Sequence, residues 1–318
     1  MTSGVVSNLA PAAATPEPEP ARASSSVALV LAGGALLGSA GLAAAYLPAA
    51  ATPLAVGGLR LGIGAIALMI AVPWLGGSRR HTIRLGRRPT IWIMALGAAG
   101  FQPLFFIAVD RAGVAIATLV AIGGVPVFAG LIAWVALARR PSRRWALATT
   151  IAVTGLILRS WGQLSVGDGL GAMLALLAAM FVACYVVAAK TELDRGTPAV
   201  ELPAAAYTIG TVLLAPLVLT QPLSWTLEPR GAALVLYLGV MTMGIGNLCS
   251  VQGMQHLEPG PAATLLLSEP LIATLLGVVI LHEALPTSGA IGIALVLVGL
   301  ALQAQSTRLS RAIATTPL

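Results

Sequence analysis

The sequence predicts an all-α, polytopic membrane protein with ten transmembrane helices, built as two inverted five-helix repeats. Three observations lead to this prediction. The 318 residues are 58% hydrophobic and only 9% charged, with a mean hydropathy of +0.93, whereas soluble domains carry roughly a quarter charged residues. The apolar residues gather in runs long enough to cross a bilayer, and most basic residues fall in alternate loops between them. Parts of the sequence also match each other at a fixed spacing.

Each apolar run is expected to form a helix, because an open strand edge would leave backbone groups unpaired in lipid. Residues 1–25 are rich in Pro, Ala, Ser and Glu and are expected to form a disordered cytoplasmic tail. The expected first repeat covers 26–161, the second covers 168–306, and 307–318 form another cytoplasmic tail. The expected spans are 27–46, 53–75, 90–109, 113–137, 145–160, 170–189, 202–220, 231–252, 261–281 and 286–304.

The basic residues predict an orientation, because short cytoplasmic loops hold the excess of Lys and Arg. Of the 18 basic residues, 14 fall on one side of the expected helices and 3 on the other, while Arg60 lies inside the second span. The richer side carries Arg22, Arg79, Arg80, Arg84, Arg87, Arg88, Arg139, Arg140, Arg143, Arg144, Lys190, Arg195, Arg308 and Arg311. We expect this side and both termini to be cytoplasmic, in a bacterial plasma membrane.

The two halves match at a shift of 144 residues, which becomes 145 in the third span. The matched pairs are Pro126 with Pro270, Leu137 with Leu281, Gly155 with Gly299, and Gln102 with Asn247. Because each half holds an odd number of helices, the second half should insert upside down relative to the first. The inversion explains why Arg139, at a cytoplasmic helix end, corresponds to Glu283 at an outer one.

Over roughly residues 27–306 the sequence resembles the EamA family of the drug/metabolite transporter superfamily. The motifs that carry the resemblance are Pro53 followed by Arg60, Pro126, Leu267-Ser268-Glu269-Pro270, and Leu281-His282-Glu283 with Gly292 and Gly299. The first half departs from the family pattern where Arg139 replaces the usual glutamate of an L-G-E segment. The resemblance implies a ten-helix permease that exports or takes up amino acids, metabolites or toxic small molecules, typically without ATP.

Glu269 is the main candidate for chemistry inside the membrane. It lies ~12 Å along a helix from Pro261, where a charge without a partner is costly. It either binds a cationic group or carries a proton in antiport, or it caps the backbone opened by Pro270 or locks helix packing through a fixed partner. The sequence favours neither alternative.

Four further polar residues are candidates for a substrate cavity. Gln102 and Asn247 are related by the repeat and are expected to line a midplane cavity, where amides suit a zwitterion or a polar metabolite. Interhelical hydrogen bonds that serve only packing remain the alternative. Tyr185 and Ser268 are weaker candidates for the same cavity.

Arg60 lies ~10 Å beyond Pro53 and is expected to extend to the outer headgroups. The alternatives are that it attracts an anionic substrate or pairs with Glu269. Pro126 and Pro270 are expected to kink their helices, with or without a hinge motion.

Several classes of protein and site are disfavoured. His81, His256 and His282 are too dispersed for a metal site and are expected to be solvated. Cys184 and Cys249 lie in apolar runs, which disfavours a disulfide framework. The sequence contains no phosphate-binding loop of the ATPase type, and its arginine clusters lack the aromatic residues of nucleic-acid sites. We therefore expect no enzyme activity, no cofactor and no nucleic-acid partner.

The favoured function is a secondary transporter of small metabolites by alternating access, with amino-acid or metabolite efflux preferred; proton coupling belongs to it only under the functional alternative for Glu269. Its partners would be a small-molecule substrate and membrane lipid. One alternative is a multidrug or toxic-cation exporter with the same fold. The alternative from another class is a non-transporting structural or sensory membrane protein, which a closed bundle without a polar cavity would indicate.

Overall fold

The computed structural model describes residues 19–160, 169–282 and 285–314, and within these ranges it is helical without strands. Nine helical segments in the described chain are long and apolar enough to cross a membrane. These are Ser24–Ala45, Pro53–Leu75, Pro89–Ala112, Ile116–Leu137, Gly169–Asp194, Glu201–Val218, Pro229–His256, Pro259–Ile280 and Thr287–Ser306. The chain is therefore a multi-pass membrane protein of the predicted all-α class.

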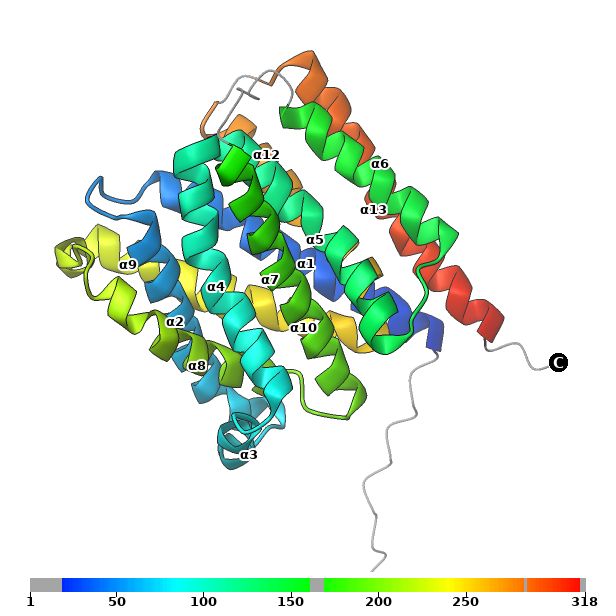
Figure 1. Cartoon of the computed structure of the whole chain (residues 1–318), viewed down its shortest axis with the longest axis horizontal. Helices are drawn as coiled ribbons and strands as arrows, with labels where there is room; N and C mark the ends of the chain where they lie inside the picture. Colours follow the sequence, from blue (N-terminus) through cyan, green and yellow to red (C-terminus); the bar gives the residue numbers. More distant parts are fainter. Residues whose placement is uncertain (1–18, 161–168, 283–284, 315–318) are drawn as a thin grey trace, which may run out of the picture.

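The fifth expected span is helical but too polar to be counted among these segments. It is α6 (Arg143–Ser160), and its 18 residues include Arg143, Arg144 and Arg159. Figure 1 shows α6 lying beside α13 (Thr287–Ala314) at the edge of the bundle. Because it runs along a helix that is apolar enough to span, we count α6 as the fifth helix of the first half.

The other helices of the first half are α1 (Glu19–Ala45), α2 (Pro53–Ala71) with the 3-10 turn η1 (Val72–Leu75), α3 (Arg79–Leu85), α4 (Pro89–Ala112) and α5 (Val114–Leu137). The short helix α3 lies in the arginine-rich loop, where the sequence predicts no helix. Pro53 and Pro89 each begin a helix, where the missing N–H of proline costs nothing.

The second half begins with α7 (Gly169–Asp194), α8 (Glu201–Val218) and the turn η2 (Ser224–Leu227). Its third span is made of α9 (Pro229–Tyr237), the π-helical η3 (Leu238–Gly246), α10 (Asn247–Gly253) and the turn η4 (Met254–His256). Its fourth span is broken into α11 (Pro259–Leu265) and α12 (Ser268–Ile280), and α13 follows.

The first and last helices extend into the segments expected to be tails. α1 begins at Glu19 and α13 continues to Ala314, because both extensions contain good helix formers such as Ala and Arg. The rest of the expected tails, 1–18 and 315–318, lies outside the described residues, as does Glu283.

The main contacts between helices recur when the two halves are exchanged, as expected for a repeat protein with approximate two-fold symmetry. α4 and α5 of the first half pack on α7, while their counterparts in the second half, η3 with α10 and α11 with α12, pack on α1. α2 packs on its own counterpart α8, and α6 packs on its own counterpart α13. Each half therefore packs its third and fourth spans on the first helix of the other half.

The contact between α6 and α13 shows the same relation at the level of single residues. A Cβ built on Gly155 would lie 2.6 Å from the carbonyl oxygen of Gly292, and one built on Gly299 would lie 2.8 Å from the carbonyl oxygen of Ala148. At the 144-residue shift, Gly155 corresponds to Gly299 and Ala148 corresponds to Gly292. Such reciprocal contacts are those of an isologous interface, here between two halves of one chain.

Three groups of elements meet at one end of the bundle, which we call the arginine-rich end. It comprises α3 with the start of α4, the loop after α5, and the end of α7 with the loop that follows it (Figure 1). In Figure 1 the described start of α1 and the described end of α13 also lie close to each other on this side of the molecule.

Candidate functional site

A cavity of about 160 Å³ lies between the two halves in the middle of the bundle. Both halves line it: Leu37 of α1, Arg60 of α2, Gln102 of α4, Val125 of α5, Tyr185 of α7, Tyr207 of α8, Asn247 of α10 and Glu269 of α12 contribute. In the described chain, α6 and α13 contribute no residue to its lining. The cavity is therefore a feature of the eight helical spans that interlock at the centre.

The fourth span of the second half breaks at the cavity. α11 ends at Leu265 and α12 begins at Ser268, and both Leu266 and Leu267 line the cavity. Pro270 lies in the first turn of α12, where its lack of an N–H is tolerated. Its counterpart Pro126 lies inside the continuous helix α5, so the two equivalent prolines have different effects.

Glu269 owes its position to this break, since it lies in the first turn of α12. The partial positive charge at a helix N-terminus favours a carboxylate there. Discontinuous helices with exposed termini are a common way to build substrate and ion sites in transporters.

The π-helical segment η3 precedes Asn247 and brings Met243 to the cavity wall. A π-helix accommodates extra residues per turn, and such segments are frequently found at functional sites. The irregular backbone of the second half is thus concentrated where it lines the cavity, and Asn247 and Glu269 are presented from it.

Helix α1 supports both irregular segments by close contact, and on the side of η3 a Cβ built on Gly33 would lie 2.6 Å from the carbonyl oxygen of Gly246. A Cβ built on Gly34 would lie 2.0 Å from the Oγ of Ser268, and one built on Gly38 would lie 2.4 Å from the carbonyl oxygen of Glu269. Ser268 therefore packs against α1 and is not among the residues that line the cavity, and its Oγ has no hydrogen-bond partner in the described chain.

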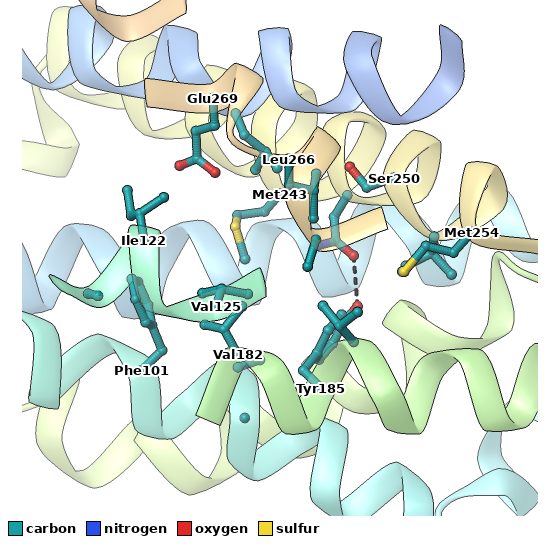
Figure 2. A pocket seen from close by; sticks show the side chains of 18 of the residues that line it. Phe101, Ile122, Val125, Val182, Tyr185, Met243, Ser250, Met254, Leu266 and Glu269 are labelled. Atoms are coloured by element: carbon teal, nitrogen blue, oxygen red, sulfur yellow. Dashed lines mark hydrogen bonds between the residues drawn. The ribbon is translucent and has the colours of Figure 1, made fainter. Parts of the chain in front are cut away.

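Tyr185 and Asn247 are joined across the cavity by a hydrogen bond. The Tyr185 hydroxyl donates to Oδ1 of Asn247 at 2.7 Å, and Figure 2 shows this bond with Glu269 and Met254 on either side of it. The ring of Tyr185 stacks on that of Tyr207, with centroids 6.2 Å apart. The bond leaves the amide NH₂ of Asn247 to donate to another group.

Two oppositely charged side chains line the same cavity. The charges of Arg60 and Glu269 attract each other, but in the described chain neither side chain makes a hydrogen bond or a salt bridge within 4 Å. Nε of Arg60 is buried, so this side chain faces the interior and does not extend to the headgroups. No hydrogen bond from Glu269 caps the backbone near Pro270 in the described residues.

Gln102 is buried on α4, close to α2. Its Oε1 has no hydrogen-bond partner in the described chain and lies where a Cβ on Gly57 would come within 2.5 Å. A buried amide oxygen without a partner is costly and points to an additional group, such as a ligand or water, that would donate to it.

The remaining wall of the cavity is apolar. Figure 2 shows Phe101, Ile122, Val125, Val182 and Met243 directed into it. The cavity therefore combines one cation, one anion, amides and phenols with a large apolar surface, which suits a small amphipathic molecule.

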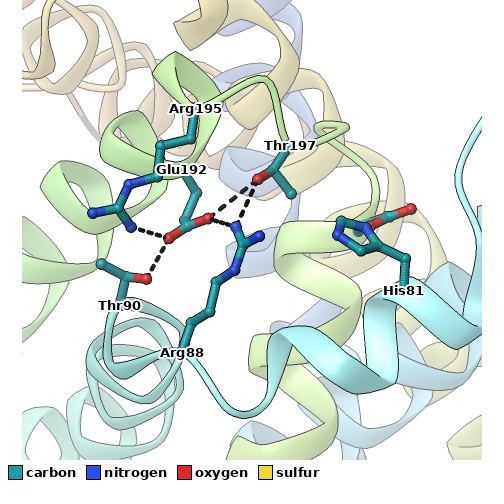
Figure 3. Close-up of polar contacts among 7 residues, drawn as sticks. His81, Arg88, Thr90, Glu192, Arg195 and Thr197 are labelled. Carbon is teal, nitrogen blue, oxygen red and sulfur yellow. Dashed lines mark hydrogen bonds and ion pairs between the residues drawn. The ribbon is translucent and has the colours of Figure 1, made fainter.

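Polar residues outside the cavity gather at the arginine-rich end (Figure 3). Glu192 is fully buried there and accepts hydrogen bonds from Arg88 at 2.5 Å, Thr90 at 2.5 Å, Arg195 at 2.6 Å and Thr197 at 3.1 Å. Arg88 and Thr90 belong to the first half, and the other three residues belong to the second. The sequence does not predict this cluster, because nothing in it relates residues about a hundred positions apart.

His81 makes a second contact at this end. Its side chain is 42% exposed, as expected of a solvated histidine, but the structure adds a contact that the sequence does not predict, between Nδ1 and the buried carboxylate of Glu201. The same carboxylate accepts a hydrogen bond from the backbone N–H of Ser78 at 2.7 Å. The cause is that α3 packs on α8 and brings the loop histidine to the start of that helix.

Neither a metal site nor a disulfide is found in the described chain. No group of three or more His, Cys, Asp or Glu side chains converges among the described residues. Cys184 and Cys249 are free, half-buried thiols in separate helices.

Comparison with known proteins places the chain among membrane transporters. Residues 24–161 and 169–304 each match the EamA-like transporter family. A protein of Bacillus subtilis (strain 168), named "Uncharacterized transporter YwfM", is 36% identical over 248 residues, which cover 78% of this chain and 82% of that protein. An "Uncharacterized transporter" of Clostridium kluyveri is 24% identical over 133 residues, or 42% of this chain and 43% of that one.

A solved structure, named only "Crystal structure of protein", has a similar fold. It superposes with a TM-score of 0.75 at 23% sequence identity, covering 91% of this chain and 99% of that one. At this identity the likeness concerns the fold alone.

Proposed function

This chain belongs to the EamA-like transporter family, and we propose that it is a secondary transporter that exports small zwitterionic metabolites, amino acids above all, across the cell membrane. The proposal rests on one observation. Arg60 and Glu269 line one small cavity from opposite halves, and neither is neutralised by a hydrogen-bonded partner in the described chain.

The two charges match the two ends of a zwitterion. A substrate carboxylate can accept from the guanidinium of Arg60, and a substrate ammonium can donate to Glu269. The amides of Gln102 and Asn247 supply further partners, and the wall around Phe101 accommodates an apolar side chain. A purely cationic dye would meet the repulsion of Arg60, which argues against a toxic-cation exporter.

The route proposed for the substrate is alternating access. The two halves interlock around the cavity, so rocking one against the other would open it first to one side and then to the other. The arginine-rich end would face the cytoplasm, because positive charge accumulates in cytoplasmic loops.

The experiment that tests the cargo is transport in everted membrane vesicles containing the full chain. The panel should hold apolar amino acids, their decarboxylated amines, their deaminated acids and cationic dyes. We expect accumulation of the amino acids and little of the single-charge analogues. Accumulation of the dyes alone would support the toxic-cation alternative, and no transport of any compound by well-folded protein would support a non-transporting role.

The role of Arg60 is tested by R60Q and R60K. A charged hydrogen bond contributes about 1.5–3 kcal/mol, so R60Q should raise the KM for amino acids about 10- to 100-fold, while R60K should retain part of the affinity. R230Q, at an exposed arginine that stacks on Tyr46, is the matched control and should behave as wild type. Equal KM values for R60Q and wild type would exclude contact between Arg60 and the substrate.

Proton coupling through Glu269 is the final part of the proposal. In proteoliposomes, E269Q should lose substrate movement driven by a pH gradient, because the amide cannot take up a proton, while exchange of substrate between the two sides should persist with a raised KM, because the amide pairs less well with the substrate ammonium. Unchanged pH-driven transport by E269Q would contradict the coupling.

A further inference from the structure

The contacts between the halves at the arginine-rich end have a consistent polarity. The ion pairs are His81 with Glu201, Arg88 with Glu192, and Arg139 with both Asp194 and Glu258. In each pair the base comes from the first half and the acid comes from the second. These pairs tie α3, the start of α4 and the loop after α5 to the end of α7, the start of α8 and the loop after η4.

Arg139 joins two separate elements of the second half. Its guanidinium donates to Asp194 at 2.6 Å and to Glu258 at 2.9 Å, while Lys190 donates to Asp194 and to the backbone carbonyl of Gln255, both at 2.9 Å. Partial burial lowers the pKa of Arg139, but the hydrogen bond to Asp194 and the charge of Glu258 outweigh it, so the pKa lies above its ordinary value. Arg139 therefore remains charged.

We infer that these cross-half ion pairs form a latch that closes the arginine-rich end of the transporter, and that opening the central cavity to that side requires them to separate. The inference rests on the proposed function, because it assumes two alternating states. It also gives a role to Arg139, the position at which the first half departs from the family pattern.

The burial of two of the acids makes the latch reversible. Removing a carboxylate from water is costly, and its attraction to a partner in the interior often does no more than offset that cost. Glu192 and Glu201 have side chains 0% and 2% exposed when the latch is closed, so both would regain water when it opens. The closed and open states can therefore lie close in free energy, and the binding of a substrate is enough to shift them.

The base and the acid of the Arg88–Glu192 pair differ in exposure, so removing one should open the latch more than removing the other. Arg88 is 40% exposed and can be hydrated in the closed state if its acid is removed, whereas Glu192 cannot. R88Q leaves the buried carboxylate with Arg195 as its remaining cationic partner in the described chain, whereas E192Q leaves no buried charge, so R88Q should open the latch more than E192Q does.

The test measures distances by pulsed electron spin resonance in nanodiscs without substrate. In a background of C184A and C249A, spin labels at R87C and Q255C report the arginine-rich end, and labels at A50C and L227C report the opposite end. All four positions are exposed, and each pair joins the two halves. In R139Q and R88Q we expect an open population about ten times as large as in wild type. In this population the distance between the labels is longer at the arginine-rich end and shorter at the opposite end.

Two variants provide the controls. R139K keeps the charge and should remain closed, and R140Q removes an adjacent exposed arginine for which no ion pair is described and should also remain closed. If a latch variant fails to fold, wild-type protein at about 0.01 M and about 1 M salt replaces it, because screening weakens the half-exposed pairs. Unchanged distances in every folded variant and at high salt, or equal opening by R140Q and R139Q, would overturn the latch.

The distance measurements test the latch independently of the transport function, because the distances are measured without substrate. Opening by R139Q with no cargo found would support the latch and leave the proposed transport without support. Normal amino-acid transport together with unchanged distances would support the transport function and reject the latch.

Discussion

Tyr185 and Asn247 show how single side chains prepare the cavity for a ligand. The tyrosine hydroxyl holds the amide of Asn247 in one orientation, with its oxygen occupied and its NH₂ left to donate. Because both residues lie on helices of the second half, the bond also fixes α7 relative to α10. If the cavity binds the proposed substrate, Tyr185 would act on it as a positioning residue through Asn247.

Y185F is expected to raise the KM for the transported amino acid about fivefold, because a hydrogen bond of this kind contributes roughly 1 kcal/mol. Uptake into everted vesicles measures the effect. The matched control is Y237F, which removes the 2.7 Å hydrogen bond between Tyr237 and Ser39 outside the cavity. A KM change in Y237F as large as that in Y185F would contradict the positioning role.

At the residue scale, polar candidates are more predictable from the sequence than their surroundings are. Gln102, Asn247, Glu269 and Tyr185 are predicted to line a cavity, and the structure places them around one, whereas Ser268, predicted with them, packs against α1. Tyr207 is not predicted, because a phenol in an apolar helix has the same pattern whether it faces a cavity, another helix or lipid. The sequence favours an Arg60 that extends to the headgroups, because a long side chain near a helix end can reach them, and the structure shows the inward alternative.

Among the elements, α1 holds the two irregular spans of the second half in place. Its glycines bring backbone against backbone at the start of α12, and this contact positions Glu269. Close approach through small residues is the usual basis of helix association in lipid, where the hydrophobic effect does not drive helices together. α1 is therefore part of the support for the site, although Leu37 is the main residue it contributes to the lining.

G38A is expected to lower the thermal unfolding midpoint and to abolish transport. Its Cβ would lie 2.4 Å from the Glu269 carbonyl oxygen, and overpacking of this kind costs about 1–3 kcal/mol. G41A on the same helix is the matched control, since its nearest contact would be the Cβ of Ala273 at 3.9 Å. Size-exclusion chromatography after heating gives both midpoints, and equal values for the two variants would show that the contact is not tight.

The helix limits are predictable because runs of apolar residues end where proline, glycine and charges begin. Pro53 and Pro229, for example, begin their helices at or within two residues of the expected starts. The π-helical turn before Asn247 and the break before Ser268 are not predictable. Pro126 and Pro270 have the same spacing in the repeat, yet only the second accompanies a break, so the position of a proline alone does not predict one.

For the whole molecule, the internal repeat and the distribution of basic residues predict the same membrane topology. The exchange-related helix contacts agree with the inverted repeat that the 144-residue shift predicts. The prediction is possible because the repeat leaves matching prolines and glycines in both halves. The ion pairs between the halves at the arginine-rich end are beyond prediction, since they involve loops and helix ends whose sequences do not repeat.

The orientation is expected to place the arginine-rich end in the cytoplasm. In the C184A and C249A background, L227C should react with a membrane-impermeant maleimide in intact cells, and R87C should react only after the cells are permeabilised. Both side chains are exposed, so access to the reagent is the only variable. The reverse pattern would show that the topology is inverted, and the cysteine-free background supplies the blank.

The polarity of the ion pairs also bears on how the halves recognise each other. Two copies of the first half, paired in the same way, would leave Arg88 and Arg139 without the acids that they contact here, and two copies of the second would bury Glu201 without His81 and Glu192 without Arg88. Such unpaired charges disfavour association of like with like. We therefore expect each half to carry charges that favour the other half over a second copy of itself, as the two subunits of a heterodimer do.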